Sequence, residues 1–365
     1  MRRYNLPGAS LAVAFEGRVV LMDGLGYANT AAREPVTPSS SFLLASVSKA
    51  ITGTLIGMLV DQGRLSLGTR PFATVLSGLR TPEGKAPVDP RVRDITIKEL
   101  LYQQGGWDTG ALGYDPVFDL VGQVDRAFGT HTQPTCEQVV RYMLGRPLNF
   151  TPGTQTHYSN LGFCVLSDVV AHVTGLTYAQ AADKMLFRPF GMTHTHLATS
   201  LRASFPGEVH YYGQGAEASG PQSPYQLPLA AASGAAGWVS TVGDLERFLV
   251  ATAAPVPGSV AFPTWPASMV GNDSPAPAEQ SPTPPGQGTW WNSDGSLPGV
   301  STEIGVFGPI AYVMLANSRN PAAFTDFSPL QDLAKRSTSL PASAWPTGNL
   351  LVPPARSLGH AGRGA

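Results

Sequence analysis

Residues 41–60 read SFLLASVSKAITGTLIGMLV, a run apolar enough to predict a helix in the protein core. We expect this helix from about Ser46 to Gln62, with Gly63 where a left-handed cap would end it. Lys49 is the one charged residue of the run. Burial of a lone ammonium group costs several kcal/mol unless the group is paired or loses its proton. The position of this lysine therefore requires a chemical explanation.

Ser46 and Lys49 are three residues apart, a spacing that places them on one face of a helix. Ser46 would lie in the first turn, where free backbone N–H groups favour developing negative charge. A serine hydroxyl becomes a good nucleophile only beside a base, and a lysine in apolar surroundings has a depressed pKa and can be that base. The pair predicts an acylating serine. The alternative is a helix-capping serine with a lysine whose head extends to solvent.

Tyr158-Ser159-Asn160 opens a second apolar helix and is a second group able to do chemistry. Next to an ammonium group the phenol of Tyr158 can relay a proton. The Asn160 amide can donate to a substrate carbonyl or hold the lysine in place. Alone, Asn160 is equally typical of a helix cap.

A third group lies in residues 290–299, WWNSDGSLPG. Gly295 follows a polar pair and allows a backbone N–H to come close to a bound carbonyl. The alternative is a plain turn leading into the apolar run 300–307.

Strand patterns occur at both ends of the chain. Residues 9–15 and 18–28 flank Glu16-Gly17 and predict a β-hairpin, and residues 300–307 and 310–317 predict a second one around Gly308-Pro309. The helical patterns lie between them, at residues 95–103, 136–144, 160–175 and 178–186, followed by a short strand and a helix within 237–251. Because a hairpin alone is marginal in water, we expect an α+β fold in which both ends form one antiparallel sheet flanked by helices.

This pattern predicts a discontinuous α/β domain, residues 1–70 and 232–340, and a mostly helical inserted domain, residues 71–231. Residues 252–288 read as a long Pro/Ser/Ala-rich connection, and residues 341–365 as a loose C-terminal tail.

The composition excludes several classes of partner. Hydrophobic residues make up 42% of the chain and charged residues 13%, against about 25% charged in an average soluble protein, and the formal net charge is −1. No dense basic block is present, so we expect neither nucleic acid nor an anionic membrane surface as a partner. We expect no transmembrane segment. With no signal peptide visible we expect a cytoplasmic protein, or a secreted or periplasmic one if a leader is missing.

The two cysteines, Cys136 and Cys164, do not form a disulfide framework. Cys164 lies in an apolar stretch and is interpreted as a small buried hydrophobic residue, with a bridge to Cys136 as the less favoured alternative. His194 and His196 lack an H-E-x-x-H pattern or a cysteine cluster, so we expect no metal site and no cofactor.

The order of the three groups, S-x-x-K, then Tyr-x-Asn, then a polar-x-Gly-Ser strand start, resembles the serine β-lactamase and penicillin-binding superfamily. It looks most like the branch of class C β-lactamases, D-alanyl-D-alanine carboxypeptidases and related esterases. The resemblance spans roughly residues 5–335 and is supported by LVDQGRLSL, PGTQTHYSNLGF and GWVSTVGDLERF. It implies a β-lactamase-like fold, Ser46 as nucleophile, Lys49 with Tyr158 as base, and an oxyanion hole formed by the backbone N–H groups of Ser46 and Ser296.

The chain departs from this family pattern at two positions. Ser293 stands where relatives carry the Lys or His that binds a substrate carboxylate, and serine offers only a neutral donor. Gln103 stands where relatives carry a histidine, and we interpret this change as structural.

We therefore expect a serine hydrolase acting through an acyl-enzyme on ester, and also amide, bonds. A carboxylesterase with at most weak β-lactamase activity is favoured. The substrate would be a small ester, amide or peptide-like molecule, contacted by Asn160, Ser293, Gly295, Ser296 and Trp291, with Trp290 beside Trp291 in the pocket wall. The alternatives are carboxypeptidase or β-lactamase activity, acyl transfer, or a non-catalytic binding protein on the same fold. The oligomeric state is not predicted.

Overall fold

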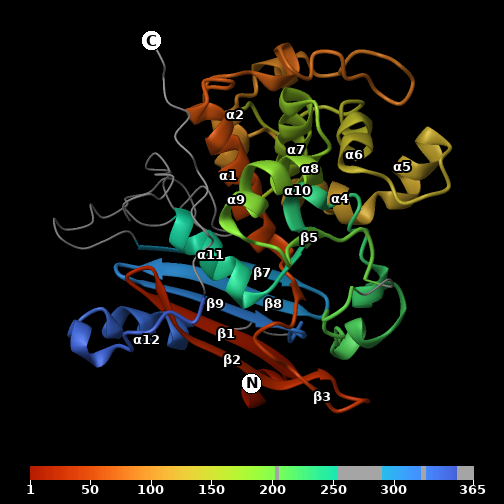
Figure 1. The fold of residues 1–365 in the computed structure, drawn as a ribbon. Helices are drawn as coiled ribbons and strands as arrows, with labels where there is room; N and C mark the ends of the chain where they lie inside the picture. Colours follow the sequence, from red (N-terminus) through yellow and green to blue (C-terminus); the bar gives the residue numbers. More distant parts are fainter. Residues whose placement is uncertain (202–204, 253–289, 322–325, 352–365) are drawn as a thin grey trace, which may run out of the picture.

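The structure is a computed structural model that describes residues 1–201, 205–252, 290–321 and 326–351. Its centre is a six-stranded antiparallel sheet in the order β3-β2-β1-β9-β8-β7 (Figure 1). The strands are β1 (Gly8–Phe15), β2 (Arg18–Asn29), β3 (Glu34–Pro35), β7 (Trp290–Leu297), β8 (Val300–Phe307) and β9 (Ile310–Ala316). The N-terminal strand β1 pairs with the C-terminal strand β9, with Ala12 opposite Val313. The prediction of one antiparallel sheet built from both chain ends is confirmed.

Turn chemistry explains the two hairpins. Glu16 and Gly17 both have positive φ, 49° and 75°, as the tight turn between β1 and β2 requires. Gly308 has φ 59° at the turn between β8 and β9. Both predicted hairpins are present at the predicted residues.

Helix α1 (Ser48–Asp61) lies in the core and is preceded by the 3₁₀ turn η2 (Ala45–Val47). The predicted helix therefore exists, but its first turn is 3₁₀ and places Ser46 just before the α-helix. Gly63, with φ 68°, ends it in the left-handed conformation expected from the sequence.

Helices cover both faces of the sheet (Figure 1). Helix α11 (Val242–Thr252) packs on the face that carries Ala12 and Val313, whereas α12 (Ser328–Ser337) packs on the opposite face. A further helical layer lies beyond α1 and α11. It consists of α2 (Ile97–Leu101), α3 (Thr109–Leu112), α4 (Pro116–Asp119), α5 (Val121–Phe128), α6 (Cys136–Met143), α7 (Asn160–Thr174), α8 (Tyr178–Ala182), α9 (Arg188–Phe190) and α10 (Ser233–Ala236).

Helix α7 is the centre of this layer, because every residue from Asn160 to Val170 is buried. A helix that is apolar on all sides belongs in a core. A small second sheet joins the two layers through β4 (Phe42–Leu43), β6 (Trp238–Ser240) and β5 (His196–Leu197), in the order β4-β6-β5. The division into two domains at residues 70 and 232 stays a prediction.

The predicted loose tail, residues 341–365, and the predicted connection, residues 252–288, are described only in part. The described part of the predicted tail is not loose, because Trp345 stacks on Phe15 with ring centroids 4.6 Å apart. The Asn349 side chain also accepts a hydrogen bond from the Val19 N–H on strand β2. The predicted connection 252–288 lies almost entirely outside the described residues, as does the end of the tail from residue 352.

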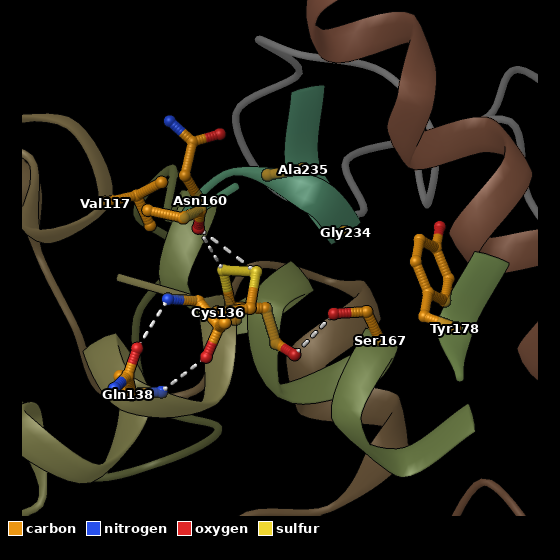
Figure 2. Close-up of a disulfide and its surroundings, with 12 residues drawn as sticks. Val117, Cys136, Gln138, Asn160, Ser167, Tyr178, Gly234 and Ala235 are labelled. Carbon is orange, nitrogen blue, oxygen red and sulfur yellow. Dashed lines mark hydrogen bonds between the residues drawn. A yellow bond between two sulfur atoms is a disulfide. The ribbon is translucent and has the colours of Figure 1, made fainter. Parts of the chain in front are cut away.

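Cys136 and Cys164 form a disulfide between α6 and α7, with Cα atoms 5.1 Å apart (Figure 2). The favoured interpretation of Cys164 as an unbridged buried thiol is therefore wrong. The two helices pack against each other, which brings together two cysteines that are 28 residues apart in the sequence. Nothing in the local pattern of either helix indicates this pairing.

Candidate active site

The turn η2 and helix α1 place Ser46 and Lys49 side by side in the molecule's interior. The Lys49 ammonium group donates to the Ser46 hydroxyl over 3.1 Å. The Lys49 side chain is almost completely buried and the Ser46 side chain is largely so. The spacing of the two residues thus produces the contact predicted from the sequence.

Lys49 is surrounded by further acceptors from other parts of the chain. Its Nζ donates to the Tyr158 hydroxyl over 2.6 Å, to Asn160 Oδ1 over 2.6 Å and to the Ala235 carbonyl over 3.1 Å. Burial lowers the pKa of Lys49 to about 7, although the negative charges of Asp115 and Asp294 raise it. Burial therefore increases the share of neutral amine near neutral pH, and the neutral amine is the form that can accept a proton.

Tyr158 completes a hydrogen-bonded triangle with Ser46 of η2 and Lys49 of α1. Its hydroxyl lies 2.7 Å from Ser46 Oγ. Tyr158 directly precedes α7, whose N-cap residue is Ser159. Gln103 holds this segment, since its side chain accepts from the Ser159 N–H and its carbonyl accepts from the His157 N–H. Gln103 thus has a supporting position behind the tyrosine, in line with the structural interpretation.

Asn160 links the triangle to Asp115, a residue that the sequence analysis missed. The Asn160 Nδ2 group donates to Asp115 Oδ2 over 2.6 Å, while its Oδ1 atom accepts from Lys49. Asp115 also caps α4 by accepting from the Val117 N–H. Burial raises the pKa of Asp115, whereas the hydrogen bonds and the Lys49 charge lower it. In the sequence, Asp115-Pro116 indicates only a helix start.

The carbonyl of Ala235 belongs to α10, which is held closely against α7. A Cβ atom on Gly234 would lie 2.4 Å from the Phe163 carbonyl oxygen, so only glycine allows this approach. The disulfide between α6 and α7 contacts the residues just before α10, because both sulfur atoms are 3.1 Å from the Ala231 carbonyl oxygen. Figure 2 shows Gly234 and Ala235 beside the bridge.

The third predicted group, on strand β7, passes directly beside Ser46. A Cβ atom on Gly295 would lie 2.4 Å from the Leu44 carbonyl oxygen and 3.0 Å from the Ser46 backbone nitrogen. Ser293, on the same face of β7, is completely buried. The side chains of Trp290 and Trp291 lie outside the described part of the structure. The structure therefore brings Gly295 to Ser46 and leaves the predicted tryptophan wall without a structural account.

Arg319 is the cation that the described residues place beside this strand. Its Nη1 group donates to Ser296 Oγ over 3.1 Å. Its Nε group donates to the buried Glu217 carboxylate over 3.0 Å, and Nη2 binds the same carboxylate. The Arg319 charge is thus matched by a fixed carboxylate. The sequence analysis did not identify this pair, whose members lie 102 residues apart.

The described residues contain no group of three or more His, Cys, Asp or Glu side chains arranged to hold a metal ion. In the same part of the chain no single helix is long and apolar enough to cross a membrane. One pair of helices joined at a bend, Asn160–Thr174 with Tyr178–Phe190, is together long and apolar enough, by length and composition only.

A model of the Beta-lactamase family matches residues 1–335. The chain is a member of the beta-lactamase family. One curated relative is "Protein flp" of Staphylococcus aureus (strain N315), which is 27% identical over 215 residues. The matched residues make up 59% of this chain and 40% of the relative. A D-aminopeptidase of Gluconobacter oxydans is 30% identical over 221 residues, or 58% of the chain and 36% of the relative. The chain thus spans well under half the length of these relatives.

Solved structures show the same beta-lactamase fold. A class C beta-lactamase superimposes with a TM-score of 0.66 at 20% identity, covering 92% of both chains. The D-amino acid amidase of Ochrobactrum anthropi SV3 gives 0.65 at 18% identity, covering 92% of this chain and 94% of the other. The predicted family and α+β fold class are confirmed.

Proposed function

We propose that this member of the beta-lactamase family is a serine hydrolase that acts through a covalent acyl-enzyme on uncharged ester, and also amide, substrates. The observation that supports it best is the triangle of Ser46, Lys49 and Tyr158, with all three contacts between 2.6 and 3.1 Å. A serine within hydrogen-bond distance of a buried amine and a phenol has the adjacent base that activates a serine nucleophile.

In the proposed reaction the neutral Lys49 amine, together with Tyr158, takes the Ser46 proton as Oγ attacks the carbonyl carbon. The tetrahedral oxyanion is bound by the backbone N–H groups of Ser46 and Ser296, which the approach of β7 to Ser46 supports. Tyr158 then protonates the leaving alcohol or amine. Water then attacks the acyl-enzyme, and the same two residues take its proton and return it to Ser46 Oγ as the bond between Oγ and the acyl carbon breaks, which releases the acid.

The charges around β7 favour a neutral substrate. Ser293 supplies no cation, and Arg319 is already paired with the buried Glu217. A substrate carboxylate would therefore have to compete with a fixed, desolvated carboxylate for the same guanidinium. This supports a carboxylesterase over a carboxypeptidase or a β-lactamase. The names of the relatives, D-aminopeptidase and D-amino acid amidase, keep small amides within the proposed range.

Covalent labelling tests the proposal. A fluorophosphonate probe and a short-chain p-nitrophenyl ester should label and acylate the wild-type protein and not Ser46→Ala. The matched control is Ser48→Ala, which removes the next serine of the chain, whose hydroxyl accepts only from the Trp238 N–H in the described contacts. Equal labelling of wild type and Ser46→Ala would refute the assignment of the nucleophile.

Substrate pairs separate the alternatives. We expect an acyl-D-Ala-D-Ala peptide with an amidated C-terminus to react faster than the same peptide with a free carboxylate, and the reverse would favour a carboxypeptidase. Ester formation with an added alcohol would favour an acyltransferase. Absence of labelling by fluorophosphonate, ester and β-lactam probes alike would favour a non-catalytic binding protein.

A further inference from the structure

Asp115 and Lys49 lie on opposite sides of one amide group. Asn160 accepts from Lys49 through Oδ1 and donates to Asp115 through Nδ2, each over 2.6 Å. An ammonium group can only donate and a carboxylate can only accept. Only one orientation of the Asn160 amide satisfies both neighbours, with its oxygen toward Lys49.

We propose that Asp115 is a positioning residue that fixes the orientation of the Asn160 amide, and through it the direction of the Lys49 amine. The inference rests on the proposed acyl-transfer function. If the amide were reversed, its NH₂ group would point at Lys49 and compete with Ser46 for the lone pair of the neutral amine. Proton transfer from Ser46 would then be slower although Ser46, Lys49 and Tyr158 were all intact.

Hydrogen bonds at the start of α4 hold the Asp115 carboxylate in the position that this role requires. One carboxylate oxygen is bound to the Val117 N–H at 2.9 Å as the cap of α4, which leaves the other for Asn160. Its own backbone N–H donates to the Asp119 carboxylate over 2.7 Å, which restrains the start of the helix. The position of the carboxylate is thus set by α4, independently of the α7 residue that it orients.

The charged groups that act here come from three elements. Lys49 from α1 and Asp119 from α4 act on Asp115, and Asp294 from β7 acts on Lys49. Removal of the Asp115 charge takes away one of the two carboxylate charges that favour the Lys49 ammonium form. The rate should fall on the acid side of its pH profile as Lys49 becomes protonated, and we call this fall the acid limb. Without the Asp115 charge the acid limb should move to lower pH.

The isosteric change Asp115→Asn tests the inference. Its oxygen can keep the cap on Val117, and its NH₂ group then faces Asn160 and forces the amide to reverse. We expect fluorophosphonate labelling of Ser46 to slow by about 10–100-fold, the range typical of groups that orient a functional side chain. The acid limb should move to lower pH. Asp326→Asn, which alters the carboxylate that accepts from the Ser328 N–H at the start of α12 on the opposite face of the sheet, is the control and should label like wild type.

The exchange variant Asp115→Asn/Asn160→Asp distinguishes orientation from a loss of structure. It pairs a donor at residue 115 with an acceptor at residue 160, which also presents an oxygen to Lys49 as in the wild type. On the plateau above the acid limb it should therefore label faster than Asp115→Asn, with its acid limb at higher pH. Thermal unfolding shows which variants are folded at the assay temperature. Wild-type rate and acid limb in Asp115→Asn, or an exchange variant no faster than Asp115→Asn, would overturn the inference. An unlabelled wild type would instead count against the proposed function itself.

Discussion

At the scale of single residues, Lys49 is a cation in a core, and its neighbours explain how it is tolerated. Four acceptors lie within 3.1 Å of its Nζ atom, and burial has lowered its pKa to about 7. Burial disfavours the charged form, and the hydrogen bonds keep the head group in one place. The same two effects support the proposed role of Lys49 as a base directed at Ser46.

This environment predicts the pH dependence of the reaction. Below a pH of about 7 Lys49 is protonated and cannot take the Ser46 proton, and above it the neutral amine is available. We expect kcat/KM for a neutral ester to fall about tenfold per pH unit on the acid side of this value and to level off above it. In Lys49→Ala the high kcat/KM that the wild type reaches above about pH 7 should be lost. The measurement is a pH profile of ester hydrolysis, and a flat profile from about pH 5 to about pH 8 would contradict the role of Lys49 as base.

At the scale of elements, the site forms where strand β7 meets the turn before α1. Thr302 of β8 donates to the Leu44 carbonyl over 2.7 Å and joins the sheet to this turn. Gly295 of β7 fits against the same carbonyl with no room for a side chain. The hydrogen bond from Thr302 and the absence of a Cβ atom at Gly295 both help to hold the sheet close to Ser46.

Gly295→Ala should separate the strand from the turn. Its Cβ atom would lie 2.4 Å from both the Leu44 carbonyl oxygen and Thr302 Oγ1, so β7 must move away from Ser46. Loss of one oxyanion donor typically reduces kcat by about 10²–10³-fold, and we expect a loss of this order with Ser46 and Lys49 intact. Gly78→Ala is the control, because nothing lies within 4 Å of its Cβ position. Similar kcat values for the two variants would rule out this role of β7.

At the scale of the whole molecule, the N-terminal and C-terminal strands pair at the centre of the sheet, and one disulfide joins two helices of the helical layer. The Cys136–Cys164 bridge joins α6 to α7 and contacts the peptide before α10. Disulfides persist in oxidising compartments. We therefore propose a secreted or periplasmic location, the alternative that the sequence left open, in place of the cytoplasm.

Reduction of this bridge should weaken the fold. Closing a loop between residues 28 apart stabilises a protein by about 3–4 kcal/mol, mainly through the unfolded chain. We expect a lower midpoint of thermal unfolding with a reductant than without it. A variant with Cys136→Ala and Cys164→Ala should unfold at the lower temperature under both conditions. A midpoint that reductant does not change in the wild type would contradict a stabilising bridge.

Short-range features of the molecule could be predicted from the sequence. The spacing of Ser46 and Lys49 makes them neighbours in any helical turn, and Glu16-Gly17 and Gly308-Pro309 make tight turns wherever the strands lie. These features depend on backbone geometry over a few residues, which the local sequence determines. The same holds for the left-handed end of the first helix at Gly63.

Long-range contacts were decided only by the tertiary structure. Three contacts join residues that are far apart in the sequence and that no helical or strand repeat brings together. They are Asp115 with Asn160, Arg319 with Ser296 and Glu217, and the bridge between Cys136 and Cys164. Each depends on how two separately formed elements pack, and packing is set by the shapes of whole faces. The sequence by itself identified Ser46, Lys49 and Tyr158 as the candidate catalytic residues, because their spacing and residue types are local features. The packing of α4, α7 and β7 decided how these residues are oriented and which charges surround them.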